Sequence, residues 1–276
     1  MGPHRSCDDA TCGGAAVPAW LRDLAGAWIF YSVLPAWPGI APRFQRIARF
    51  APLIGLVLGG LQGLLWLASE SWLPAAPRVA LVMALALVLS GGLHHDGALD
   101  TADGLAAGPR ALEAMQDSRV GAAAVQAALL LALLRAAGLL CLVELSASIG
   151  AMAMLWAGFW GRVAPLLAMQ RYPYLRPQPE AGGSAAFHLH HWRGLGRELL
   201  PALLVGLPLL VATAALPAGG VPGLALAGLP PALLVPWWLG RRLGGHSGDS
   251  YGACVEWGET LALLLTGLLG SWVVAG

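Results

Sequence analysis

The most regular feature of the chain is a series of long apolar runs separated by shorter polar segments. A helix that crosses a membrane needs about 20 predominantly apolar residues. Runs of this kind cover roughly residues 50–68, 76–93, 120–143, 145–160, 198–217, 221–239 and 260–275. The pattern predicts an all-α fold, a polytopic membrane helix bundle with about seven transmembrane helices and a range of roughly six to eight.

The N-terminal part of the chain is less regular. An apolar segment near 18–34 carries Arg22 and Asp23, so we expect it to lie against the membrane or the bundle. Residues 1–17 are polar and have no apolar core, which indicates a disordered leader and no cleaved signal peptide. Residues 18–276 are expected to form one integral-membrane domain.

The charge content supports a membrane protein, and the arginines predict its orientation. Charged residues make up 11% of the chain, which is under half the share of about 25% in soluble domains. If the predicted spans alternate, most arginines fall on one side, which the positive-inside rule makes cytoplasmic. We therefore expect a multi-pass protein of a bacterial inner membrane, with this cytoplasmic group of arginines: Arg43, Arg46, Arg49, Arg110, Arg119, Arg162, Arg171, Arg176, Arg193, Arg197, Arg241 and Arg242.

Carboxylates gather in two polar segments on that same side. "GGLHHDGALDTADG" follows the second apolar run and holds Asp96, Asp100 and Asp103, whose i, i+4, i+7 spacing places them on one helix face. "GGHSGDSYGACVEWGE" follows the sixth run and holds Asp249 and Glu256. Like charges so placed repel one another, and an oxygen-only ligand set suits Mg²⁺. We expect one Mg²⁺ site built from both loops, because acids at membrane depth are usually functional rather than merely solvated.

Other polar residues near these acids fit a phosphate ester as the bound group. Arg119 and Arg162 are predicted at span boundaries near the acids, where a phosphate contact and a topology anchor are equally open interpretations. Gly248 allows close backbone approach to a ligand. His94 is a candidate general base. The histidines of "FHLHHW" (188, 190 and 191) either bind metal or belong to an interfacial belt.

The two polar segments also resemble a known family. "GGLHHDGALDTADGLA" with "ALEAMQDSRVGA", and the later "RRLGGHSGDSYGACVEWGE", are similar to the motifs of adenosylcobinamide-GDP ribazoletransferase, or cobalamin synthase. Weaker matches are "RFAPLIGLVLGGL" and "YLRPQPEAGGSAAFH", so the resemblance covers about residues 28–265. Ser247 stands where the family commonly has Thr, and "SVLP" at 32–35 replaces a frequent T-R-L-P.

The resemblance implies a transferase of cobalamin nucleotide-loop assembly. In that family α-ribazole, or its 5′-phosphate, reacts with adenosylcobinamide-GDP, and the products are adenosylcobalamin, or its 5′-phosphate, and GMP. Mg²⁺ is the implied cofactor. The implied partners are these corrinoid and ribazole substrates and the lipid bilayer, with no nucleic acid. A homo-oligomer, or association with other cobalamin-assembly enzymes, is compatible with this interpretation.

The residues and the implied reaction together lead to a hypothesis about individual roles. We expect the ribazole 5′-oxygen to attack the phosphorus nearest the cobinamide, with His94 as base. The residues expected to hold Mg²⁺ on the diphosphate, or a second ion, are Asp96, Asp100, Asp103, Asp249 and Glu256. The residues expected to bind phosphate or substrate are Arg119, Arg162, Arg242, Ser247 and Gly248.

Two alternatives remain open from the sequence. A CDP-alcohol phosphatidyltransferase also begins with D-G and binds metal through several aspartates, but the rest of its motif is absent here. A divalent-cation transporter would place acids near mid-span in broken helices. The acids of this chain are predicted at span ends, which favours the transferase.

Overall fold

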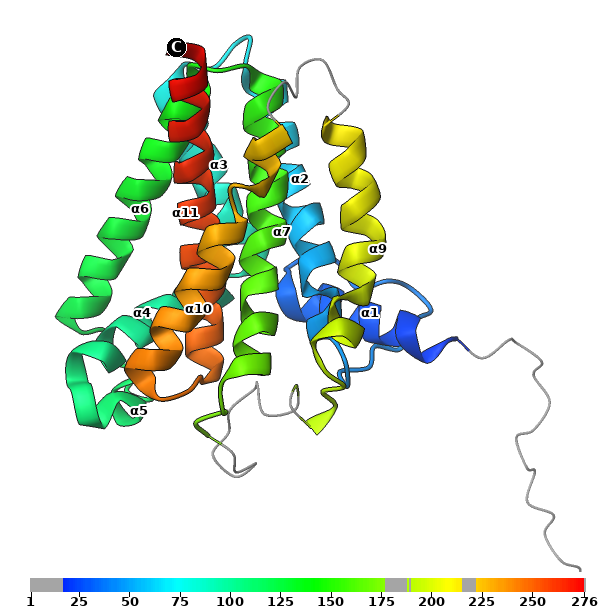
Figure 1. Cartoon of the computed structure of the whole chain (residues 1–276), viewed down its shortest axis with the longest axis vertical. Coiled ribbons are helices and arrows are strands. Elements are labelled where there is room, and N and C mark those ends of the chain that lie inside the picture. The colour runs from blue at the N-terminus through cyan, green and yellow to red at the C-terminus, as the bar shows by residue number, and fades with distance from the viewer. Residues whose placement is uncertain (1–16, 177–187, 189, 215–221, 276) are drawn as a thin grey trace, which may run out of the picture.

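The computed structural model describes residues 17–176, 188, 190–214 and 222–275, and all the regular elements in these ranges are helices (Figure 1). The α-helices are α1 (Ala19–Tyr31), α2 (Ala51–Ser69), α3 (Ala75–Ser90), α4 (Leu93–Ala107), α5 (Ala111–Ala114), α6 (Ala122–Val143), α7 (Ala147–Arg171), α9 (Leu195–Ala214), α10 (Leu229–Leu243) and α11 (Gly248–Ala275). Short 3₁₀ turns η1 (Ala48–Phe50), η2 (Gly108–Arg110) and η5 (Pro222–Leu226) precede α2, α5 and α10.

The membrane-spanning helices agree with the predicted fold class. Within the described ranges, 6 helices are long and apolar enough to cross a membrane, and a bent pair formed by α3 and α4 raises the number to 7. Figure 1 shows these helices as one bundle, with α1, α4 and α5 at one end and the C-terminus at the other. The polar leader, except residue 17, lies outside the described residues, as do 215–217 of the predicted fifth span.

Three boundaries differ from those expected. α7 extends to Arg171, so Arg162 lies inside a helix and not in the following loop or at a span boundary. α11 begins at Gly248, so Asp249 and Glu256 are helical rather than in a loop. Polar residues end an apolar run in the sequence, but they do not end the helix where partners inside the bundle satisfy their charges. α1 has 13 residues, about 20 Å at 1.5 Å per residue, which is too short to cross the bilayer.

A glycine pair redirects the chain between α3 and α4. Gly91 and Gly92 have φ angles of 62° and 71°, a left-handed conformation that glycine adopts without the steric cost of a Cβ atom. The two helices consequently meet at 91°. α4 therefore runs across the end of the bundle, at the end opposite the C-terminus (Figure 1).

Small residues set the close helix contacts. A Cβ atom at Gly97 of α4 would lie 2.6 Å from the carbonyl oxygen of Asp249, so glycine is required where α4 crosses the start of α11. In the apolar core, Gly55 of α2 packs against the backbone of α7 at Gly158, as expected for the glycine-rich "LIGLVLGGLQG". The α4–α11 crossing places the two carboxylate segments side by side.

Candidate functional site

A cavity of about 200 Å³ lies at the α4–α11 crossing, where α1 and α7 also meet. Its walls include Asp96 from α4, Asp249 from α11 and Arg162 from α7, together with several apolar residues. Segments that are more than a hundred residues apart in the chain thus contribute carboxylates to a single cavity.

The first two carboxylates of α4 are the most available. The side chain of Asp96 is exposed and that of Asp100 is partly buried, and neither makes a hydrogen bond or an ion pair with any described residue. Asp100 interacts electrostatically with Asp96, Asp249 and Asp103, which carry the same charge, and with Arg176, which offsets part of their repulsion. A bound cation would relieve this repulsion.

The third carboxylate of α4 caps a helix. One oxygen of Asp103 accepts the backbone N–H of Gly121 at 2.7 Å, and the other accepts that of Ala124 at 2.9 Å. These are N–H groups at the start of α6, where Gly121 is the N-cap residue. Asp103 therefore shares a helix face with Asp96 and Asp100 but is held by the next transmembrane helix.

Asp249 is held by a loop that comes back to the site. Its Oδ2 lies 3.3 Å from Nη2 of Arg176 and accepts a hydrogen bond from the hydroxyl of Ser247 at 3.3 Å.

The loop that carries Arg176 is joined to the segment before α11 by backbone hydrogen bonds. Leu175 N–H donates to the carbonyl of His246, and His246 N–H donates to the carbonyl of Pro173. Burial lowers the pKa of His246 to about 4, so its ring is neutral near pH 7. From the sequence, Arg176 is expected only as a cation of the cytoplasmic loop, because its contact with Asp249 depends on the fold.

Glu256 lies deeper in the bundle, within a buried cluster of charges. It forms an ion pair with Arg135 of α6 at 3.3 Å and lies 3.4 Å from Nδ1 of His95. One turn further along α11, Glu259 pairs with Arg162 and lies 3.7 Å from Arg135. Arg135 was missed as a candidate, although a lone arginine inside the apolar run 120–143 is a signal of a buried partner.

Arg162 connects this cluster to the cavity. Its Nη1 donates to Glu259 and to the carbonyl of Gly158, while its buried Nε finds no partner among the described residues. Because Arg162 is also one of the residues that line the cavity, this unused donor lies close to it. This arrangement suits an anion such as a phosphate oxygen.

Two of the predicted phosphate ligands lie elsewhere. Arg119 is exposed and pairs with Asp117, whose pKa is lowered to about 2 by hydrogen bonds from the Arg119 side chain and backbone. Arg242 is exposed, lies near the ring of Trp238 and lines a separate cavity. Ser247 is buried beside the site, and Gly248 lines it.

Tyr31 at the end of α1, His94 and His188 form one wall of the cavity. His94 is buried, and its Nε2 has no partner in the described part of the chain. The Tyr31 hydroxyl lies 3.4 Å from Nε2 of His188, and burial lowers the pKa of His188 to about 3. His188 therefore lines the cavity as a neutral ring, whereas His190 and His191 line a different pocket.

The donor set fits Mg²⁺ only if the substrate completes its shell. No group of three or more His, Cys, Asp or Glu side chains in the described ranges is arranged to hold a metal ion. Mg²⁺ typically takes one or two carboxylates and fills its shell with waters and phosphate oxygens. The unpaired oxygens of Asp96 and Asp100, next to Asp249, match that requirement, and Glu256 is already paired with Arg135.

Comparison with known proteins identifies the family. The chain matches the family model described as Cobalamin-5-phosphate synthase over residues 23–267. A curated relative from Prochlorococcus marinus strain MIT 9303, named adenosylcobinamide-GDP ribazoletransferase, is 56% identical over 261 residues, which cover 91% of this chain and 97% of the relative. A relative of the same name from Thermosynechococcus vestitus is 42% identical over 249 residues, covering 88% of this chain and 95% of the relative.

No solved structure matches the chain. The family match nevertheless includes α4, α7 and the part of α11 that lines the cavity, and the relatives align over nearly their whole length. The chain therefore belongs to the cobalamin-5-phosphate synthase family.

Proposed function

We propose that the chain joins an α-ribazole to adenosylcobinamide-GDP with release of GMP, and that this reaction takes place in the cavity between α4 and α11. The names of the relatives support the reaction. The proposed position of the active site rests on one observation: Asp96, Asp249 and Arg162 line the same cavity. Carboxylates and a guanidinium with an unused donor are the groups that a metal-bound diphosphate requires.

The family name favours a nucleophile other than the 5′-oxygen expected from the sequence. A product that is cobalamin 5-phosphate keeps a phosphoryl group on the 5′-oxygen of its ribazole. That oxygen cannot also attack the phosphorus of adenosylcobinamide-GDP. The attacking group is therefore a different ribose hydroxyl, whose oxygen forms the new P–O bond as the bond to GMP breaks.

Mg²⁺ remains a proposal that the donor set supports. Asp96 and Asp100 would hold it, with Asp249 as the contribution from α11. When bound, Mg²⁺ would neutralise charge that develops on the diphosphate. Asp103 is proposed in a lesser role because both of its oxygens already accept backbone N–H groups.

The protein's own side chains would orient the phosphates and accept the proton. The unused Nε–H of Arg162 would donate to a diphosphate oxygen, while Glu259 keeps the guanidinium in place. His94 lies on the same cavity with an unpartnered Nε2, so it is the proposed acceptor of the proton from the attacking hydroxyl. For Arg119 and Arg242 the geometry supports surface roles instead.

From the sequence the acids are expected at span ends, which argues against a transporter, but two of them lie elsewhere. Glu256 and Glu259 lie inside α11, a position that a transporter would favour. Both, however, are paired with arginines, and a buried charge neutralised in this way is no longer a free cation ligand. Family membership together with this pairing supports the transferase over the transporter and the CDP-alcohol phosphatidyltransferase.

The proposed location is the inner membrane of a bacterium, with the cavity on the cytoplasmic side. The cavity is lined by α4 and the start of α11, which lie at the bundle end that carries α1 and α5 (Figure 1). Among the described residues, the segments between α1 and α2 and between α5 and α6 also lie at this end, and they contain Arg43, Arg46 and Arg119. The positive-inside rule supports a cytoplasmic position for that end.

The reaction is tested with purified protein in nanodiscs. Adenosylcobinamide-GDP, α-ribazole 5′-phosphate and Mg²⁺ are added, and chromatography follows both GMP and the corrinoid product. We expect equal amounts of both products, and no product when EDTA is present. Release of GMP without a new corrinoid, or turnover that is indifferent to EDTA, would contradict the proposal.

A further inference from the structure

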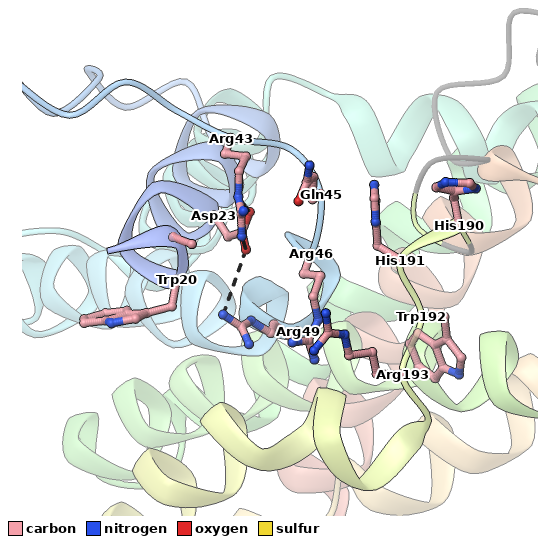
Figure 2. Close-up of a pocket in the computed structure, with 11 residues that line it drawn as sticks. Trp20, Asp23, Arg43, Gln45, Arg46, Arg49, His190, His191, Trp192 and Arg193 are labelled. Atoms are coloured by element: carbon pink, nitrogen blue, oxygen red, sulfur yellow. Dashed lines mark hydrogen bonds and ion pairs between the residues drawn. The ribbon is translucent and has the colours of Figure 1, made fainter. Parts of the chain in front are cut away.

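A second pocket, of about 580 Å³, lies beside the cavity lined by Asp96 and Asp249, which we call the carboxylate cavity. The charged residues of this second pocket are mainly arginines. We call it the arginine pocket. Figure 2 shows its lining, with Trp20 and Asp23 of α1 on one side, the segment 190–193 on the other, and arginines between them. The four arginines of the lining are Arg43, Arg46, Arg49 and Arg193.

Two buried carboxylates hold the arginines in place. Asp23 is fully buried and accepts two hydrogen bonds from Arg43, at 2.8 and 2.6 Å, and its Oδ2 lies 4.0 Å from Arg49. Glu198 of α9 is also buried and accepts two hydrogen bonds from Arg46, at 3.2 and 2.6 Å. Guanidinium groups fixed in this way lose less conformational entropy when they bind a ligand.

Positive charge remains in excess after this pairing. Four arginines face only two carboxylates, Asp23 and Glu198. Arg193 is exposed, and its side chain makes no ion pair with the described residues. The Nε of Arg49 is buried and has no partner among them. A purely structural set of ion pairs would be expected to balance its charges and to use its buried donors.

We propose that the arginine pocket binds a phosphate ester. Arginine is the side chain whose fork of N–H donors matches phosphate oxygens, and Arg43 and Arg46 each keep Nη1 outside the hydrogen bonds to their carboxylates. His190 and His191 add ring nitrogens to the same lining. The pocket volume is within the range of small-molecule sites.

The position of the pocket suggests two sources for this ester. Arg49 lines the arginine pocket while its neighbour Ala48 lines the carboxylate cavity, and His190 and His188 are divided in the same way. One source is therefore the phosphate carried by the phosphorylated ribazole, an assignment that rests on the proposed function. The other is the headgroup of an anionic lipid, because the pocket lies at the end of a membrane bundle.

Binding is tested first with inorganic phosphate, by calorimetry on the protein in phosphatidylcholine nanodiscs, without corrinoid or Mg²⁺. We expect Arg193→Gln and Arg49→Gln to weaken binding by about tenfold each, since each removes a charge-assisted contact. Arg197→Gln is the matched control, because Arg197 is an exposed arginine of α9 outside the pocket lining. No binding by the unaltered protein, or equal binding by all variants, would overturn the inference.

Two further arms identify the source. If the ester is the substrate, Arg193→Gln raises KM for α-ribazole 5′-phosphate but not for α-ribazole. If it is a lipid, phosphatidic acid added to the nanodiscs competes with inorganic phosphate, and does so less well in Arg193→Gln. A response in neither arm would show that no phosphate ester uses the pocket.

The two proposals fail independently. If the protein binds phosphate but shows no turnover, only the proposed function is refuted. If it shows turnover but does not bind phosphate, only the inference about the arginine pocket is refuted.

Discussion

Asp96, Asp100 and Asp103 share one face of α4, but their surroundings differ. Asp96 and Asp100 have no side-chain partner in the described part of the chain, whereas Asp103 accepts two backbone N–H groups of the α6 N-terminus. Carboxylates at helix N-termini stabilise the helix through these hydrogen bonds and through the helix dipole. The three aspartates therefore have different roles: Asp103 caps a helix, whereas the oxygens of Asp96 and Asp100 are available to a ligand.

Substitutions at Asp103 separate its two suggested roles. We expect Asp103→Ala to lower the free energy of unfolding by about 1 kcal/mol, the usual cost of losing a cap. Asp103→Asn keeps one acceptor oxygen and should cost less. Chemical unfolding in detergent measures both, and turnover is measured on the same samples. If Asp103→Asn kept its stability but lost as much turnover as Asp100→Asn, Asp103 would be a metal ligand and not mainly a cap.

The sequence predicted the residues of the cavity better than their contacts. Motif spacing singled out Asp96, Asp100 and Asp249, and a predicted position near the acids singled out Arg162; three of these four residues line the cavity. The contacts of Arg176 and Arg135 depend on which helices pack together, because their carboxylate partners are far away in the chain. No local pattern around either arginine contains that information.

Among the helices, the apolar runs predicted position well and length poorly. The predicted span 50–68 corresponds closely to α2, whereas α11 begins twelve residues before the predicted 260. The difference arises because the first turns of α11 carry Asp249, Glu256 and Glu259, which lower the local hydropathy. Arg176, Arg135 and Arg162 supply their counter-charges, and these come from other parts of the fold.

The α4–α11 crossing is the element that assembles the cavity, and Gly97 allows it. We expect Gly97→Ala to separate the two helices, because the added Cβ atom would lie 2.6 Å from the Asp249 carbonyl oxygen. Overpacking of this kind costs about 1–3 kcal/mol, and turnover should fall as Asp96 and Asp249 move apart.

Gly196→Ala is the matched control for this substitution. It lies near the start of α9, where no heavy atom lies within 4 Å of the added Cβ. We expect its thermal unfolding and turnover to match those of the unaltered protein. Equal behaviour of the two variants would show that the crossing tolerates a side chain and does not set the geometry of the site.

At the scale of the whole molecule, the bundle has two ends of different chemistry. One carries α4, α5, the carboxylate cavity and the arginine pocket, and the other carries the α2–α3 turn and the C-terminus (Figure 1). Substrates and products that are phosphate esters require an aqueous approach to the first end. Its proposed cytoplasmic position is consistent with that requirement.

Cysteine labelling tests this orientation. In a variant whose four native cysteines are replaced, Ser71→Cys lies in the exposed α2–α3 turn and Ser118→Cys lies in the exposed segment before α6. We expect a membrane-impermeant maleimide to label only Ser71→Cys in intact cells, and both positions in opened membranes. The reverse labelling in intact cells would place the cavity on the outer side.

The most direct test of the central claim compares two aspartate variants in the reconstituted reaction. Asp100 lies among the carboxylates of the α4–α11 crossing, whereas Asp117 is an exposed partner of Arg119. Both Asp100→Asn and Asp117→Asn remove one negative charge with little change in shape. We predict a fall in GMP release of roughly 100-fold or more for Asp100→Asn, without loss of folded protein, and unchanged release for Asp117→Asn. Near-normal turnover by a folded Asp100→Asn protein would contradict the account.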